Sequence, residues 1–416
     1  MSELDQYRTT LREWLAANLE PRAAVGPRPI NLAEQDEMTP ERLAAERALQ
    51  RRIHDAGYAG ITWPVEYGGQ GLTAAHQKVF DEEARAYVLP DFGIVGAATF
   101  KVCAPTMLAH ATPELLHEHI PRVLAGDELI VQFFSDPEAG SDLAGVRTQA
   151  VRDGDRWILS GSKIWSSGAQ YADYGLCLAR TDWDVPKHRG LTWFAVPVRA
   201  PGVTVTPIRQ INGSAEFCQE FFDEVELPDS ARVGEVNDGW TVTQTMLRLE
   251  RSAGGQARPA VPAAPIAPDL VALASEGDRL GDPVVRDLIV RAHVDDVVRG
   301  HLHARIAALM AADPTGAGAL ASFSKLAAGT FDPERANLAL QIGGAAAWSD
   351  PTSDTARAGA RFLNSRFMAI AGGTNEMQRN SIGERVLGLP REPSFDANTP
   401  FREVLRKAQN WSGKVG

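Results

Sequence analysis

Residues 132–142 read QFFSDPEAGSD, an apolar run that ends in a turn rich in proline, glycine, serine and aspartate. The run itself, at residues 129–134, has the length and composition of a short buried strand. Small residues in the turn leave backbone N–H groups free, and such a turn suits close approach to a ligand phosphate. Most turns of this composition bind nothing, so the segment predicts a strand end and indicates a binding site only in combination with others.

A β-rich block surrounds this segment. Asp153-Gly154 separates two short runs, at 147–151 and 157–159, in the manner of a hairpin with a D-G turn. β-Branched and aromatic residues repeat the strand pattern in three further runs, at 191–198, 203–208 and 217–225. The sequence therefore predicts a central β-rich domain over residues 128–234.

Helical patterns occupy both flanks of that block. Leu11, Leu15 and Leu19 recur with i+4 spacing near the N-terminus. Further helices are expected at 41–56, 74–124, 241–251, 284–310, 316–342 and 354–368. The prolines of residues 252–268 cannot belong to one helix and predict an extended loop. Separate α, β and α blocks predict an α+β fold, with an all-α domain at 1–127 and a C-terminal four-helix bundle domain at 235–416.

The composition excludes several classes of protein. Apolar residues make up 44 % of the 416 residues, and the formal net charge of −11 argues against a general nucleic-acid binder. The three cysteines, Cys103, Cys177 and Cys218, are too scattered for a disulfide framework, so a reducing cytoplasm is expected. The N-terminus has no secretory signal pattern, and no apolar run approaches the roughly 20 residues of a membrane span.

A second strand end, at residues 163–168, reads KIWSSG. It places Trp165 beside two hydroxyl groups, a combination that can stack on a flat ring system and bond to its heteroatoms. Alone, it is more often a core tryptophan with surface serines. About thirty residues after QFFSDPEAGSD, and in this order, it gives the pair of segments much greater specificity.

These segments resemble those of the acyl-CoA dehydrogenases. The resemblance extends over nearly the whole chain, through WPVEYGGQG at 63–71, QFFSDPEAGSD at 132–142, KIWSSGAQYAD at 163–173, FFDEVELP at 221–228 and GGTNEMQRN at 372–380. It implies oxidation of an acyl-CoA thioester to the trans-2-enoyl-CoA in fatty acid or lipid metabolism. It also implies bound FAD, although no GxGxxG fingerprint is present, and an electron-transfer flavoprotein or similar electron acceptor.

The resemblance assigns cofactor contacts position by position. The implied FAD contacts are Gln132, Phe134 and Ser135 at the pyrimidine side, Ser141 at the pyrophosphate, Trp165 and Ser167 at the flavin, and Thr374 and Glu376 in the C-terminal segment. Gln341 and Gly344 lie in a QxxGG-like segment that, in the family, meets the adenosine of FAD held by a neighbouring subunit. The chain is therefore expected to form a homo-oligomer, either a dimer or a tetramer, or a hetero-oligomer with a related subunit.

Two positions depart from the family pattern. Residues 277–283 read GDRLGDP, with Gly277 where the family often carries a pyrophosphate-binding arginine and Arg279 two residues later. Gly372 stands where the family usually places the glutamate that removes the substrate α-proton. Its backbone N–H can still polarise the thioester carbonyl, but another carboxylate must act as the base.

Glu250 is the candidate base. Leu249-Glu250-Arg251 resembles the Glu-Arg sequence from which isovaleryl-CoA and long-chain acyl-CoA dehydrogenases provide their base, and Arg251 would support its geometry or charge. The alternative is that Glu250 forms a structural ion pair. The missing side chain at Gly372 would leave room for a branched or ring-bearing acyl group.

The sequence also offers other candidate residues and two rival functions. Arg189, in the loop 187–189, could pair with a CoA phosphate or simply be a solvated basic residue. His117 and His119, like His301 and His303, are two positions apart and face different sides of a helix, so no metal is assigned. The rival functions are a non-catalytic partner subunit of a hetero-oligomeric acyl-CoA dehydrogenase and a flavin oxidase on the same scaffold.

Overall fold

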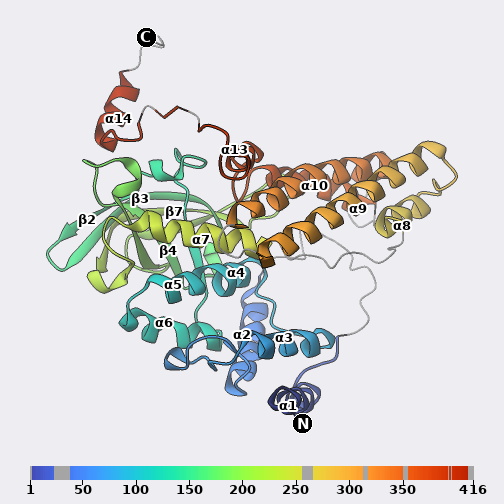
Figure 1. The fold of residues 1–416 in the computed structure, drawn as a ribbon, viewed down its shortest axis with the longest axis horizontal. Coiled ribbons are helices and arrows are strands. Elements are labelled where there is room, and N and C mark those ends of the chain that lie inside the picture. The colour runs from blue at the N-terminus through green and yellow to red at the C-terminus, as the bar shows by residue number, and fades with distance from the viewer. Residues whose placement is uncertain are drawn as a thin grey trace.

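The structure, a computed structural model, describes residues 2–22, 38–254, 266–312, 317–349, 355–391, 393–394 and 396–410. Helices form the N-terminal part, a sheet follows, and helices return (Figure 1). The N-terminal helices are α1 (Glu3–Asn18), α2 (Pro40–Asp55), α3 (Ala74–Glu83), α4 (Gly93–Ala98), α5 (Ala104–His110) and α6 (Pro113–Ala125). A π-helical turn, η3 (Thr99–Cys103), joins α4 to α5.

The N-terminal helices begin where the sequence provides caps. The Ser2 side chain accepts from the Asp5 N–H in a capping box, and Thr39 and Thr112 cap α2 and α6, each followed by a proline. Because α6 ends at Gly126, whose φ of 80° favours glycine, its boundary is also set locally. The predicted helices of this region are confirmed, except that the run expected at 74–124 is interrupted by non-helical residues at 87–92 and 111–112.

A single eight-stranded sheet forms the middle of the chain. Its strands are β1 (Ile130–Phe133), β2 (Gln149–Asp153), β3 (Arg156–Ser167), β4 (Tyr174–Arg180), β5 (Leu191–Pro197), β6 (Val203–Ile208), β7 (Phe217–Pro228) and β8 (Arg232–Val233). They lie in the order β6-β7-β3-β2-β4-β5-β8, with β1 added parallel to β4. The predicted hairpin is the β2–β3 pair, and the other predicted strands are present.

The sequence analysis missed β4. Every residue of β4 after Tyr174 is buried, because the strand lies between β1 and β2 on one side and β5 on the other. A strand buried on both faces has no alternation of polar and apolar residues, so its pattern is a short apolar run without a strand signature.

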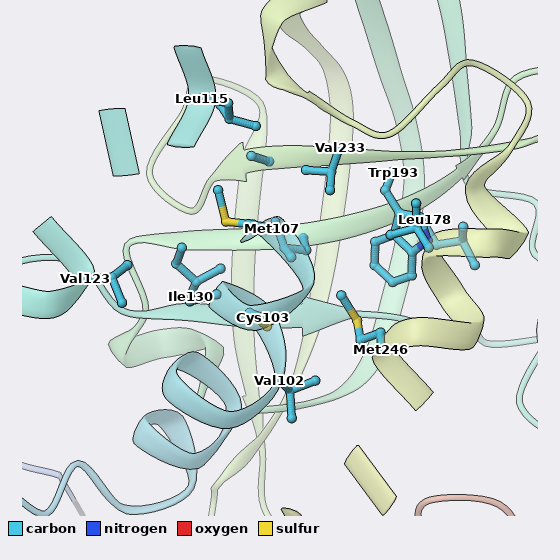
Figure 2. Packing of buried hydrophobic residues seen from close by; sticks show 14 of the residues in the cluster. Val102, Cys103, Met107, Leu115, Val123, Ile130, Leu178, Trp193, Val233 and Met246 are labelled. Carbon is cyan, nitrogen blue, oxygen red and sulfur yellow. The ribbon is translucent and has the colours of Figure 1, made fainter. Parts of the chain in front are cut away.

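One core joins the N-terminal helices to the sheet and to the first C-terminal helix, α7 (Gly239–Gly254). In Figure 2, Met107 and Cys103 from the N-terminal helices lie with Leu178 and Trp193 of the sheet and Met246 of α7. The Trp193 indole N–H donates to the Gly239 carbonyl (2.9 Å), so the start of α7 is tied to β5. This attachment fixes the direction of α7 and of the residues on its last turns.

The C-terminal helices after α7 are α8 (Pro268–Glu276), α9 (Pro283–Ala312), α10 (Ala321–Gly343), α11 (Ala346–Ser349), α12 (Ala356–Ser365), α13 (Asn375–Arg385) and α14 (Phe401–Gln409). α10 is central and contacts α7, α8, α9, α12 and α13. α9 and α10 run side by side away from the sheet (Figure 1). The α+β prediction, with helical domains on both sides of a β domain, is confirmed.

The extended loop predicted at 252–268 is wrong at both ends. α7 continues to Gly254 and α8 begins at Pro268, a position where proline fits a helix because its missing N–H has no intrahelical partner. The rest of that prediction, residues 255–265, lies outside the described residues. Within the described ranges, no helix has both the length and the apolar character that crossing a bilayer requires.

Candidate functional site

Three parts of the chain meet at Gly372. This residue lies in the loop between η9 (Arg366–Ala369) and α13 and has a φ of 65°. A Cβ built on Gly372 would lie 3.3 Å from Cε of Lys325 in α10 and 3.6 Å from Oε1 of Glu250 in α7. The Glu250 carboxylate therefore lies within contact distance of the side-chain position at residue 372.

The π-helical turn of the N-terminal part reaches the same place. Cys103, the last residue of η3, is fully buried and belongs to the same core as Met246, one helical turn before Glu250 (Figure 2). Burial raises the pKa of the Cys103 thiol, and the nearby Glu250 carboxylate raises it further. The Cys103 thiol donates to Gln132 Oε1 (3.6 Å), so the end of β1 joins the cluster. A π-helical turn at this point is typical of a functional site.

Lys325 is a member of the cluster that the sequence analysis missed. Its ammonium donates to the Met368 carbonyl (2.6 Å) in η9 and is half-buried between α10 and the Gly372 loop. Burial lowers the pKa of Lys325, while the Glu250 and Asp332 carboxylates oppose that shift. The available sequence signal was a single lysine among small and apolar residues in ASFSKLAAG, residues 321–329.

Hydrogen bonds from α13 hold the Gly372 loop in place. The Gln378 side-chain amide donates to the carbonyls of Gly372 and Gly373, both at 3.1 Å. Thr374 caps α13 by accepting from the Met377 N–H (3.2 Å). Among the described residues no acceptor is found for the Gly372 N–H, which is therefore available to a ligand.

The structure does not bring the side chains of Glu376 and Arg251 into this cluster among the residues that it describes. Glu376 lies in the first turn of α13, where its exposed carboxylate pairs with Arg379 (3.3 Å). Arg251 belongs to α7, but its side chain lies outside what the structure describes. The cluster is therefore built from Glu250, Lys325 and Gly372, with Gln132 and Cys103 beside them.

A strained bulge in β3 presents Trp165. The register between β3 and β7 shifts between Ile164 and Ser166, and Trp165 has a φ of 69°, which costs an L residue about 1–2 kcal/mol. The indole is 57 % exposed, with Phe217 packed edge-on at 6.2 Å. Ser167 follows, half-buried and paired with Phe217 in the ladder. Strain of this kind, with a large apolar face left open, is typical of ligand sites.

Phe217 connects this bulge to the Gly372 loop. Its ring lies 6.3 Å from the ring of Phe367 in η9, five residues before Gly372. The aromatic series from Trp165 through Phe217 to Phe367 therefore runs from the β domain to the C-terminal segment. Trp165, Ser167 and the Gly372 loop border one region of the molecule.

A buried ion pair fixes the turn after β1. The Asp136 carboxylate accepts from the Lys163 ammonium (2.6 Å) and from the Thr148 N–H (2.7 Å). Lys163 also donates to the Phe134 carbonyl (2.8 Å), and the Ser135 carbonyl accepts from the Ile164 N–H (2.9 Å). Phe134 and Ser135 are thus tied to β3 through their backbone, whereas Ser141 lies exposed farther along the turn.

Gln341 and Gly344 are not brought into this cluster. Gln341 lies sixteen positions after Lys325 on α10, about 24 Å along a helix. Arg279 lies with them, because its guanidinium donates to the carbonyls of Ile342 (2.6 Å) and Gln341 (3.2 Å). We call Arg279, Gln341 and Gly344 the distal cradle. The structure thus separates the predicted cofactor residues into two sets, one at each end of α10.

Arg189 lies in a loop that is fixed by its neighbour. The loop is the short helix η6 (Lys187–Arg189), and the Lys187 ammonium pairs with Asp142 (2.9 Å) and with Asp396 (2.7 Å). These bonds join η6 to the turn after β1 and to the segment before α14. Arg189 itself is exposed, so its guanidinium is accessible to a ligand at the edge of the β domain.

The three parts of the chain match the three domain models of one enzyme family. The matches are "Acyl-CoA dehydrogenase, N-terminal domain" over residues 1–127, the middle domain over 132–225 and the C-terminal domain over 237–387. Acyl-CoA dehydrogenase IpdE1 of Mycobacterium tuberculosis is 34 % identical over 393 residues, which cover 94 % of this chain and 99 % of that protein.

Two solved structures are also similar to this chain over most of its length. The protein described as "Tcur3481-Tcur3483 steroid ACAD" aligns with a TM-score of 0.71 at 29 % identity, covering 94 % of this chain and 98 % of that chain. The ChsE4-ChsE5 complex from Mycobacterium tuberculosis aligns with a TM-score of 0.65 at 29 % identity, covering 94 % and 99 %.

Proposed function

The chain belongs to the acyl-CoA dehydrogenase family and is an oxidoreductase of that class, and from this premise we propose that it converts an acyl-CoA to the trans-2-enoyl-CoA with Glu250 as the base. The observation that carries the proposal is the position of the Glu250 carboxylate, 3.6 Å from the point where a Cβ of residue 372 would lie. A carboxylate that enters the site from α7 can reach the substrate α-carbon that a glutamate at 372 would otherwise reach.

The Gly372 N–H performs the second task of the site. The α-proton of a thioester is too weakly acidic in water to be removed at a useful rate, so the carbonyl oxygen must be polarised by a donor held in place. The Gly372 N–H has no acceptor among the described residues, and the Gln378 amide fixes the loop that carries it. We assign this N–H to the thioester carbonyl, with Arg251 as support for Glu250.

FAD is the cofactor that the proposal requires, and the residues present fit it. Trp165 offers an exposed aromatic face on a strained bulge, Ser167 follows it, and the turn after β1 is fixed by the Asp136–Lys163 ion pair. These features suit a flat heteroaromatic ring with a phosphate group extending from it. When bound, FAD would supply the acceptor for the hydride of the substrate β-carbon. The remaining proposed contacts are Gln132, Phe134, Ser135, Ser141, Thr374 and Glu376.

The distal cradle serves a second FAD, one bound mainly by a neighbouring subunit. This assignment follows the family resemblance of the QxxGG-like segment, and α10 places the cradle about 24 Å from Lys325. Arg279 takes the place of the arginine that is absent at Gly277, because its guanidinium already lies against the Gln341 and Ile342 carbonyls. The chain would then act as an oligomer. The proposed domain boundaries within each chain lie near 1–127, 128–234 and 235–416. An electron-transfer flavoprotein would accept the electrons.

The proposed substrate class rests on a relative. The Tcur3481-Tcur3483 protein, whose fold this chain shares, is described as a steroid ACAD. We therefore propose a branched or ring-bearing acyl group, with Arg189 pairing with a CoA phosphate.

The test is anaerobic titration of the purified flavoprotein with a panel of acyl-CoAs, for wild type and Glu250→Gln. Wild type should bleach the flavin with a branched or ring-bearing acyl-CoA. Glu250→Gln should keep the flavin spectrum and bleach at least a thousandfold more slowly, because removal of an essential base costs several orders of magnitude. Equal bleaching by both proteins would contradict the assignment of Glu250.

One observation favours a second function. One similar structure is described as the ChsE4-ChsE5 complex, and another carries the paired name Tcur3481-Tcur3483. With the usual glutamate missing at 372, this chain would then be the non-catalytic partner of a related subunit. A colourless protein that acquires flavin only with that partner, and whose Glu250→Gln variant leaves the complex fully active, would establish the second function.

A further inference from the structure

Lys325 and Glu250 approach the same point from different helices. The Lys325 Cε lies 3.3 Å and the Glu250 Oε1 3.6 Å from the position of a Cβ on Gly372, so these two atoms are at most about 7 Å apart. The Lys325 ammonium is anchored by its hydrogen bond to the Met368 carbonyl (2.6 Å). A half-buried cation is therefore held beside the carboxylate that we assign as the base.

We propose that Lys325 is a positioning residue for this base, and that its ammonium keeps the Glu250 carboxylate ionised and directed at the Gly372 loop. The inference rests on the proposed function, in which Glu250 removes the α-proton. It adds a second residue to the proposed site, because the base and its cation come from α7 and α10 and meet beside Gly372.

Charge gives the first argument. A cation within about 4–6 Å of a carboxylate favours its ionised form and lowers its pKa by roughly 1–3 units. The converse effect is present at Lys325, where burial lowers the pKa and the Glu250 carboxylate raises it. An ionised carboxylate is the form that accepts a proton, so the cation keeps the base active at lower pH.

Two other titratable groups that the structure describes lie close to this pair. On the side of η3, the Cys103 thiol faces Glu250, but its raised pKa keeps it protonated and uncharged. On α10 itself, Asp332 opposes the lowering of the Lys325 pKa and is paired with Arg299. The side chain of Arg251, next to Glu250, lies outside the described residues.

Packing gives the second argument. The aliphatic part of Lys325 fills part of the space that a side chain at 372 would occupy, since its Cε would lie 3.3 Å from the missing Cβ. Glycine at 372 therefore leaves the base pocket occupied by the lysine rather than empty. With a glutamate at 372, Lys325 would have to move. The observed position of Lys325 therefore depends on glycine at 372.

The first measurement needs neither flavin nor activity. Competitive acetylation read by mass spectrometry gives the pKa of each lysine from its labelling rate at different pH values. In Glu250→Gln, Lys325 should lose the carboxylate that raises its pKa, so its labelling near pH 8 should increase severalfold. Lys187, paired with Asp142 and Asp396, is the internal control and should not change. A Lys325 profile that is the same in both proteins, including no labelling in either, would overturn the proposal.

The second measurement follows flavin bleaching against pH for wild type, Lys325→Met and Lys325→Arg. Lys325→Met should move the acid limb of the profile up by about one pH unit or more, because the Glu250 pKa rises when the cation is removed. The rate should then fall about tenfold on the acid side and recover at high pH. Lys325→Arg keeps the charge and should keep the profile. An equal loss at all pH values would mean a structural role only and would overturn the proposal.

The two proposals fail in different ways. If Glu250→Gln still bleaches, Glu250 is not the base and the proposed function is wrong in that respect. If Glu250→Gln is inactive but Lys325→Met has the pH profile of wild type, Glu250 stands and only the inference about Lys325 is wrong. If Lys325→Met does not fold, the acetylation measurement, which leaves Lys325 in place, still decides the question.

Discussion

Gly372 meets two independent demands on one residue. Its φ of 65° lies in the left-handed region, which an L side chain enters at a cost of about 1–2 kcal/mol. Its neighbours also leave little room, since a Cβ would lie 3.3 Å from Lys325 and 3.6 Å from Glu250. The backbone conformation and the close neighbours of residue 372 therefore both favour glycine over the family's usual glutamate.

Gly372→Ala should therefore reduce both stability and activity. We expect the free energy of unfolding to fall by about 1–2 kcal/mol from the backbone strain alone. We also expect flavin bleaching to slow by roughly tenfold, because the methyl group presses on Lys325 Cε (3.3 Å), the residue that we infer positions Glu250. Urea denaturation and anaerobic rapid mixing measure the two effects.

Gly281→Ala is the matched control. Gly281 has no left-handed φ, and a Cβ there would meet no atom within 4 Å. This variant should change neither the unfolding midpoint nor the bleaching rate appreciably. If Gly372→Ala proves as stable as the control, then the loop relaxes around the methyl group and residue 372 does not constrain the site.

At the scale of elements, the β3–β7 pair carries a buried acid behind the Trp165 bulge. Glu220 is fully buried opposite Lys163 and accepts from the Ser166 hydroxyl (2.9 Å). Its other oxygen, Oε1, has no partner in the part of the chain that the structure describes. Burial raises the pKa of Glu220 from 4.5 to about 8, although Ser166 and Lys163 act to lower it.

This raised pKa predicts that stability falls as the pH rises. Between the unfolded pKa of 4.5 and the folded pKa of about 8, the folded protein retains a proton that the unfolded chain has lost. The contribution of Glu220 is therefore complete below pH 4.5, and it declines by about 1 kcal/mol per pH unit up to pH 8. Glu220→Gln removes this dependence, so its urea midpoint should rise relative to wild type between pH 5 and pH 8. Glu226→Gln, an exposed position on the same strand, should show no such trend.

Elements with local signals were predictable from the sequence, and those set by distant contacts were not. The strand end at Gln132, the hairpin at Gly154 and the capped helices depend on turn and cap residues a few positions away. β4 depends on its neighbours in the sheet, so its burial gave no pattern. Trp165 was predictable as an aromatic at a strand end, but its strained φ was not. Lys325 was missed because its role arises from contact with Gly372, which is 47 positions away.

At the scale of the molecule, α10 separates the two sets of cofactor residues. Lys325 lies near its first turn with Glu250 and Gly372, and the distal cradle lies at its last turn. A helix is stiff over this length, so the two sets cannot close on one another within a chain. From the proposed function we therefore expect the base and the cradle of one chain to serve different cofactors, so that a functional site would require two chains.

Mixed oligomers test this arrangement directly. One chain carries Glu250→Gln, the other carries Arg279→Ala with Gln341→Ala, and each has a different affinity tag so that only mixed dimers are recovered. Alone, the first variant should bind flavin without bleaching it, and the second should lose flavin. In the mixed dimer, one of the two sites combines an intact base with an intact cradle, so up to about half of the wild-type activity should return. If the cradle served the site of its own chain, each site would carry a defect and no activity would return. Restoration therefore shows that the base of one chain works with the cradle of another, which no measurement on a single variant can do.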